Sequence, residues 1–199
     1  MIRRFVLSLY LLMLTGNAFA LPVIYDESVS GDLSSPLMQG AAQTAFTFDV
    51  GANTVSGTTS VNLPDENAVP IADADSFGFT VPAGLMLVGG AVELADVTGN
   101  LISARWRLFL GGLGRASGTE LELIAVNSPG TYTFLSTPLG AGDYNLSPDS
   151  LTFTLNPGID AAHYTFTFTV ASVPEPAMLG LFSVALVGLS FSRRRRIAK

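Results

Sequence analysis

The stretch "HYTFTFTV", residues 163–170, alternates large apolar side chains with polar ones along its whole length. A side-chain period of two is typical of a β-strand that buries one face and exposes the other. We therefore expect one set to face a core and the other to face water. The two sets are Tyr164, Phe166, Phe168 and Val170 on one side, and His163, Thr165, Thr167 and Thr169 on the other.

Other segments show the same alternation, and together they indicate the fold class. The clearest are 45–50 (AFTFDV), 77–81 (FGFTV) and 151–155 (LTFTL), and weaker strand candidates are 54–62, 85–94, 104–110, 121–126 and 131–135. Turn sequences rich in Gly, Pro, Asn and Asp separate them, and no long amphipathic helix or fixed-period repeat interrupts the series. The sequence predicts an all-β domain over residues 21–172, an antiparallel jelly-roll-like β-sandwich of eight or nine strands.

The N-terminus has the order of a secretory signal peptide. Two arginines precede a short apolar run, Phe5 to Leu14, and the small residues Ala18 and Ala20 of a cleavage site follow it. This order predicts that residues 1–20 are removed by signal peptidase, with Leu21 as the first mature residue. An N-terminal membrane anchor is the alternative, but the apolar run is shorter than the ~20 residues of a bilayer span.

Charge and cysteine content restrict the function of the domain between the termini. The chain has no cysteine, so neither a disulfide nor a cysteine-based metal site can form, and the core alone must stabilise an exported domain. Residues 21–173 contain three arginines, no lysine and fifteen acidic residues, a net charge of −12. Such a domain repels nucleic acid, so we expect no nucleic-acid partner.

The C-terminus, residues 173–199, has three parts in order. A rigid Val173-Pro174-Glu175-Pro176 is followed by the uncharged run 177–192 and by a basic end, 193–199, that begins with four arginines. The run predicts a single transmembrane helix, and the positive-inside rule places Arg193, Arg194, Arg195 and Arg196 in the cytoplasm as a membrane stop. A basic nucleic-acid-binding tail is the alternative, which the preceding apolar run disfavours.

This three-part order resembles the PEP-CTERM sorting signal of Gram-negative bacteria. The resemblance implies that a membrane-embedded exosortase recognises the tail and cleaves near Pro174-Glu175-Pro176. It further implies export through the inner membrane, transient anchoring there by the C-terminal helix, and release to the cell surface or the extracellular space. Proteins of this kind are typically surface or matrix proteins of bacteria that make exopolysaccharide and biofilm.

The central domain resembles a second family, the bacterial pre-peptidase C-terminal-type domains. The similarity rests on residues 73–84 (DADSFGFTVPAG), 138–146 (PLGAGDYNL) and 163–170, whereas residues 101–137 depart from the family pattern. It implies a jelly-roll-like sandwich in an accessory, adhesive or sugar-facing module.

No convergent set of catalytic groups is recognisable, so we expect the protein not to be an enzyme. His163 is the only histidine, and it lies on the threonine side of its strand, where a solvated surface role is the usual one. Paired carboxylates could support glycosidase chemistry, but the sequence does not show which acidic residues pair.

Asp73 and Asp75 are the candidate metal ligands. No cofactor is required by any motif, but hard oxygen donors in a loop suit Ca²⁺, which takes roughly six to eight oxygens. The alternative is that an aspartate caps its own turn.

Arg105, Trp106 and Arg107 are a candidate ligand-binding group, because they hold most of the domain's positive charge. The two arginines could pair with the carboxylates of an anionic polysaccharide. The alternative is a buried Trp106, with arginines that cover neighbouring acidic residues.

The exposed threonine rows invite one further hypothesis, a hydroxyl array of the ice-binding type. Strand twist disfavours it, because such an array must be flat. The expectation is therefore a non-catalytic structural or adhesive protein of the surface or matrix. The alternative is a carbohydrate-binding module, calcium-dependent if Asp73 and Asp75 hold the ion.

Overall fold

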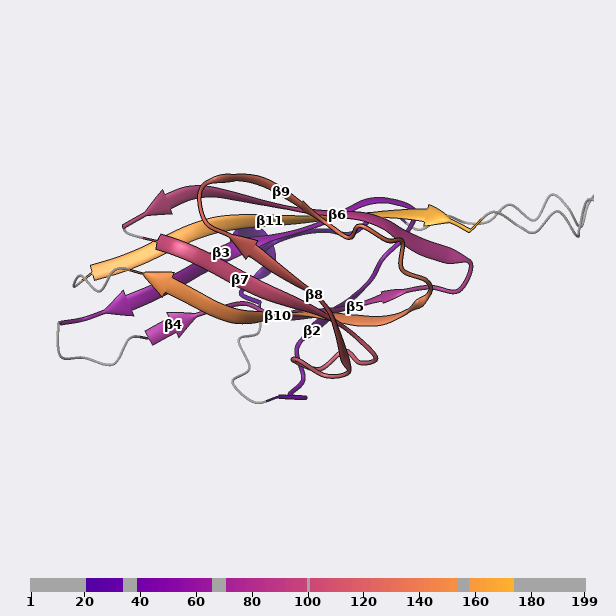
Figure 1. The fold of residues 1–199 in the computed structure, drawn as a ribbon, viewed down its shortest axis with the longest axis horizontal. Coiled ribbons are helices and arrows are strands. Elements are labelled where there is room, and N and C mark those ends of the chain that lie inside the picture. Colours follow the sequence, from indigo (N-terminus) through magenta and orange to yellow (C-terminus); the bar gives the residue numbers. More distant parts are fainter. Residues whose placement is uncertain (1–20, 34–38, 66–70, 100, 154–157, 174–199) are drawn as a thin grey trace, which may run out of the picture.

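A computed structural model describes residues 21–33, 39–65, 71–99, 101–153 and 158–173. Two facing β-sheets form the described domain (Figure 1). The six-stranded sheet has the order β1-β3-β11-β6-β9, with β4 paired to β3, and the five-stranded sheet has the order β2-β5-β10-β7-β8. The strands of the six-stranded sheet are β1 Ile24–Asp26, β3 Gly51–Leu63, β4 Ile71–Asp73, β6 Leu85–Thr98, β9 Gly130–Phe134 and β11 Gly158–Ser172. The strands of the five-stranded sheet are β2 Thr44–Thr47, β5 Phe77–Val81, β7 Leu101–Leu110, β8 Thr119–Val126 and β10 Gly142–Phe153.

Strand β11, which contains the opening stretch, lies in the middle of the six-stranded sheet and pairs antiparallel with both β3 and β6. Its apolar set is buried as predicted: Phe166 and Phe168 are fully buried, and Tyr164 and Val170 nearly so. Burying one such side chain contributes about 1.5–3 kcal/mol. The alternating segment thus forms a central strand of its sheet and contributes its apolar side chains to the core.

Aromatic rings from both sheets fill the space between them. Phe168 of β11 packs against Phe79 of β5, with ring centroids 4.8 Å apart, and Phe79 stacks on Phe48 at 4.4 Å. Trp106 of β7 meets Phe166 edge-on at 5.2 Å. Pairs of this kind add about 0.5–1.5 kcal/mol beyond the area they bury.

The all-β sandwich is confirmed, but two details of the prediction were wrong. The described residues form eleven strands rather than eight or nine, and the sheets are not wholly antiparallel, because β1 pairs parallel to β3 and β2 parallel to β5. Parallel neighbours need a long connection, and here the intervening chain crosses to the other sheet. Alternation reports which face of a strand is buried, but not the direction of its neighbour.

Strand β10 is longer than its alternating part. Residues 151–153 of the predicted strand 151–155 are the end of an element that begins at Gly142, and residues 154–155 lie outside the described part of the chain. Its earlier part contains Asn145, Ser147 and Pro148, which are poor strand formers, and a bulge follows Pro148 in the pairing with β7. The polar side chains of Asn145 and Ser147 are accommodated because residues 112–117 form hydrogen bonds with them on the outer face.

Candidate functional site

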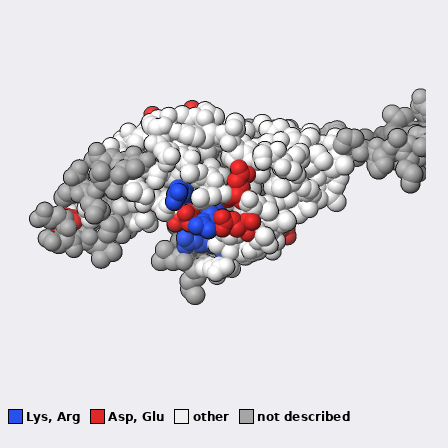
Figure 2. Space-filling model, in the orientation of Figure 1, with Lys and Arg blue, Asp and Glu red and all other residues white. Residues whose placement is uncertain are grey.

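A hollow on the outer face of the five-stranded sheet, the arginine hollow, is the first candidate. Its volume is about 340 Å³, and its lining includes Arg107 and Phe109 of β7, Arg115, Glu120 of β8, and Asp149 of β10. Figure 2 shows blue and red side chains gathered together over this part of the molecule. The described residues contain no lysine and only three arginines, Arg105, Arg107 and Arg115, so the blue side chains belong to these.

Arg107 organises the arginine hollow through two ion pairs. Its Nε donates to Oδ1 of Asp149 at 2.7 Å, and one terminal nitrogen donates to Oε2 of Glu120 at 2.6 Å. The hydrogen bond that Arg107 donates to Asp149, and then the one that it donates to Glu120, raise the pKa of the guanidinium. The group is therefore a fixed cation held between two carboxylates.

Two strand irregularities aim the carboxylates at Arg107. In the register of β10 with β7, Pro148 pairs with Trp106 and Ser150 with Arg105, so Asp149 is the extra residue of a bulge. A second shift, between Leu108 and Phe109 of β7, brings Glu120 of β8 opposite Phe109. Bulges redirect side chains in this way, and they often lie beside functional sites.

The loop that contains Arg115 is held in place by a buried polar pair under it. The amide nitrogen of Asn145 donates to the carbonyl oxygens of Gly112 and Ser117, at 3.0 and 2.8 Å. The backbone N–H of Ala116 donates to Oγ of Ser147 at 2.8 Å. Both side chains are fully or almost fully buried, so this wall of the hollow is preformed rather than assembled on binding.

Two further features fix the same loop. Gly78 of β5 lies under it, and a Cβ there would come 2.8 Å from the carbonyl oxygen of Leu113. From the other side, the side-chain amide of Gln39 donates to the carbonyl oxygen of Ala116 at 3.0 Å. A side chain larger than glycine at position 78 would lift the loop off the sheet.

The three residues of the predicted ligand-binding group, Arg105, Trp106 and Arg107, do not share one face of the five-stranded sheet. Trp106 is 1% exposed and belongs to the core, so its ring cannot contact a ligand at the surface. Arg107 points to the opposite face and pairs with acidic residues, which agrees with the alternative interpretation of a buried Trp106 beside arginines that cover acidic residues. Arg105 is exposed on that outer face but does not line the hollow. Alternation along one strand explains this division, since neighbouring residues point to opposite faces.

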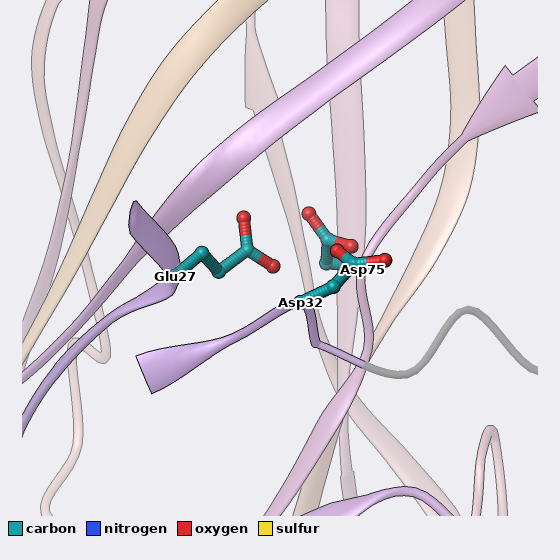
Figure 3. A group of neighbouring side chains, drawn as sticks. All are labelled: Glu27, Asp32 and Asp75. Atoms are coloured by element: carbon teal, nitrogen blue, oxygen red, sulfur yellow. The ribbon is translucent and has the colours of Figure 1, made fainter. Parts of the chain in front are cut away.

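A second candidate, the acidic cluster, consists of Glu27, Asp32 and Asp75. Glu27 comes from the short helix α2 (Glu27–Ser30), Asp32 follows that helix, and Asp75 lies between β4 and β5. Carboxylate oxygens of all three lie within 4.8 Å of one another. In Figure 3 the side chains of Glu27, Asp32 and Asp75 converge from these separate segments.

Asp75 is the buried member of the acidic cluster. It is 1% exposed, and the hydroxyl of Tyr164 donates to its Oδ2 at 2.9 Å. Burial, and then the charge of Glu27, raise the pKa of Asp75 to about 8. Burial, and then the charge of Asp75, raise the pKa of Tyr164 as well. At neutral pH, Asp75 therefore holds a proton unless a cation replaces it.

The side chain of Glu27 passes over Gly57 of β3 to join the acidic cluster. Its carboxylate accepts hydrogen bonds from the backbone N–H groups of Leu33 at 2.8 Å and Thr58 at 2.9 Å. Burial raises its pKa, and these two hydrogen bonds oppose the rise. Gly57 of β3 pairs with Tyr164, and a Cβ there would come 2.5 Å from the tyrosine hydroxyl and within clashing distance of the Glu27 carboxylate.

The structure divides the predicted calcium pair. Asp75 joins the acidic cluster, whereas Asp73 ends β4 and is not among the three converging carboxylates, although its charge contributes to the raised pKa of Asp75. Carboxylate oxygens suit a hard cation, so the cluster fits calcium by donor type. Sequence reasoning missed Glu27 and Asp32, because they lie in another part of the chain and no motif links them to Asp75.

The residues of both predicted cleavage regions lie mostly outside the described part of the chain. Ala18 and Ala20, Pro174 to Pro176, the predicted helix 177–192 and Arg193 to Arg196 are all beyond it. Leu21 and Val173 are its first and last residues, and the N–H of Val173 donates to the carbonyl oxygen of Gly84 at 2.8 Å. Within the described residues, no helix is both long enough and apolar enough to span a membrane.

His163 lies on the outer face of β11, opposite Thr58 of β3. This is the face that the alternation predicted for it. On the same face, Thr167 stands opposite Thr54 and Ala91, and Thr165 stands opposite Ser56 and Glu93.

The described fold defines a class, a two-sheet β-sandwich, and comparison with known proteins adds the cellular route. A family model described as the PEP-CTERM protein-sorting motif matches residues 172–196. The chain therefore carries this sorting motif at its C-terminus, which makes it an exported protein targeted to exosortase. No curated protein sequence matches the chain.

Several solved structures are similar in part. One is PliG of Aeromonas hydrophila, a periplasmic inhibitor of g-type lysozyme, at 10% identity over 64% of this chain and 96% of that one, with a TM-score of 0.32. Two others come from infectious bursal disease virus. The VP2 subviral particle is 12% identical over 59% of this chain and 32% of that one, with a TM-score of 0.27. The structure of the Gx strain is 12% identical over 75% of this chain and 41% of that one, with a TM-score of 0.30. All three TM-scores lie below 0.5, so these similarities carry no argument here.

Proposed function

We propose that this exported protein is a non-catalytic structural or adhesive component of the bacterial surface or extracellular matrix, associated with exopolysaccharide. One observation carries the proposal: the sorting motif begins at Ser172, the last residue of the central strand β11. Cleavage near the Pro-Glu-Pro would therefore remove none of the buried residues of the described core. The released product would be a complete sandwich.

Processing provides the test. Replacing Pro174, Glu175 and Pro176 together by alanine should leave the protein in the inner membrane, because the extended motif would be lost and a helix could continue through it. The full chain should be expressed in a bacterium that has an exosortase, and cell fractions should be analysed by intact mass. Pro129→Ala, which changes an exposed turn proline of the domain, is the control.

The expected surface product lacks residues 1–20 and ends near residues 173–176. Surface material that still carries residues 177–199 would mean that the tail is an ordinary anchor. Protein that stays in the inner membrane without any alanine replacement would contradict the proposed delivery to the surface.

A second candidate function is a carbohydrate-binding module. The preformed arginine hollow, with its fixed loop and its paired charges, is the observation that favours it. Pockets that bind small ligands are usually preformed and place a few polar groups against apolar surface. Specific, saturable binding to a glycan array would distinguish this function from a purely structural one.

A further inference from the structure

The arginine hollow combines opposite charges in equal number. Its lining contains two arginines, Arg107 and Arg115, and two carboxylates, Glu120 and Asp149. The rest of the domain is strongly acidic, since residues 21–173 carry a net charge of −12. The hollow is thus a locally neutral region on an anionic surface, and a polyanion that approaches it is repelled by the surroundings.

The ion pairs also engage the groups that an anionic ligand would need. Arg107 already contacts two carboxylates at 2.6 and 2.7 Å, so a third carboxylate, from a ligand, would have to displace one of them. This argues against the anionic polysaccharide expected from the sequence.

The same geometry suits a ligand that both donates and accepts hydrogen bonds. A guanidinium has five N–H donors, and the two ion pairs of Arg107 use Nε and one terminal nitrogen. Each carboxylate contacts Arg107 through one of its two oxygens, Oδ1 in Asp149 and Oε2 in Glu120. Donors and acceptors therefore lie side by side, which matches neighbouring hydroxyl groups on a sugar ring, because each hydroxyl can donate one bond and accept others.

Apolar surface is present at the same place. Phe109 follows Arg107 by two residues on the outer face of β7, is partly exposed and lines the hollow, together with Pro148. A hexose ring has an apolar C–H face that can pack on such a side chain while its hydroxyl edge meets the charged groups. Because the loop wall is already fixed by Asn145 and Ser147, binding would not have to order it.

We propose that the arginine hollow binds an uncharged hexose unit of a polysaccharide, with the Arg107–Glu120–Asp149 group contacting neighbouring hydroxyls and Phe109 packing on the ring. The inference rests on the proposed association with exopolysaccharide, for which it names the site and the ligand class.

The test measures binding of the full chain, purified in mild detergent, to immobilised neutral polymers (a glucan, a mannan and a galactan) and to alginate, a uronic acid polymer. The variants are Arg107→Ala and Arg107→Lys, because lysine keeps the charge but loses the planar fork. Arg105→Ala, on the same strand face but outside the hollow, is the matched control. Melting temperatures verify that each variant is folded.

We expect retention on at least one neutral polymer, a loss of tenfold or more for both Arg107 variants, and an unchanged affinity for Arg105→Ala. Equal binding by wild type and Arg107→Ala would overturn the site but leave the association with polysaccharide standing. Salt-sensitive binding to alginate alone would overturn the neutral ligand class. Binding to none of the polymers would overturn the inference, whereas the proposed delivery to the surface is decided separately by the cell fractions.

Discussion

The arginine hollow and the acidic cluster use carboxylates in opposite ways. In the hollow, Glu120 and Asp149 stay near water and share Arg107. In the cluster, Glu27, Asp32 and Asp75 converge on one another, and Asp75 is buried beneath the other two. In the first arrangement each carboxylate pairs with a guanidinium near water, whereas in the second the burial of Asp75 forces its carboxyl to take up a proton or a cation. The pH and added calcium should therefore affect the stability of the domain mainly through the acidic cluster.

The largest expected effect is a pH dependence of stability that comes from Asp75. Its pKa is about 8 in the fold and about 3.9 in an unfolded chain, so the folded state holds a proton that the unfolded state loses above pH ~4. The stabilisation is complete below pH ~4 and is lost progressively as the pH rises to about 8. Over this pH range, the free energy of unfolding measured in urea should fall by a few kcal/mol.

Asp75→Asn should remove most of this slope, because an amide does not titrate and can still accept a hydrogen bond from Tyr164. Asp149→Asn, in the arginine hollow, is the matched control and should keep the slope. If the stability of the wild type instead rises between pH 4 and 8, and Asp75→Asn abolishes that rise, Asp75 is ionised in the fold and the comparison fails.

The next effect concerns the space that the acidic cluster requires. Gly57→Ala should destabilise the domain by about 1–3 kcal/mol, because its Cβ would meet the Tyr164 hydroxyl and the Glu27 carboxylate. Gly140→Ala, at an exposed position with open space around the added Cβ, is the control. Equal small losses of melting temperature in the two variants would show that Glu27 does not lie over Gly57.

Calcium should distinguish the two regions more weakly. At ten times its dissociation constant, a bound ion stabilises a fold by about 1.4 kcal/mol. We expect millimolar calcium to raise the melting temperature, and to raise it more at pH 8 than at pH 6, because the ion must displace the proton of Asp75. Asp75→Asn should abolish the shift and Asp149→Asn should retain it. An unchanged melting temperature at both pH values would eliminate the calcium prediction.

The smallest effect is expected in the arginine hollow. Arg107→Ala should lower the melting temperature only slightly, since surface ion pairs contribute little to stability. Thermal unfolding in low and high salt measures this directly. A loss as large as that of Gly57→Ala would mean that the ion pairs hold β7, β8 and β10 together, and the contrast between the two regions would disappear.

Much of the core could be predicted from the sequence, because burial on one face of a strand leaves a period of two. The buried positions of β11 and β5 follow directly from that pattern, as does the outward position of His163. The sorting motif could also be recognised from the sequence, because its three parts are contiguous in the chain and do not depend on the fold. The same alternation explains Trp106: its charged neighbours Arg105 and Arg107 point outward, and its own ring lies in the core.

The candidate sites depended on the tertiary structure. Asp75 meets Glu27 and Asp32 only because the N-terminal segment pairs parallel to β3, and a parallel edge pairing leaves no periodicity in the sequence. Arg107 meets Asp149 only because a bulge after Pro148 inserts one extra residue in β10. The sequence alone determined most of the strands, their buried faces and the C-terminal sorting motif, because each of these is a local pattern. Which carboxylates pair with Arg107, and which carboxylate is buried among other acidic groups, was decided by the fold, because electrostatic partners are set by distance in space and by burial.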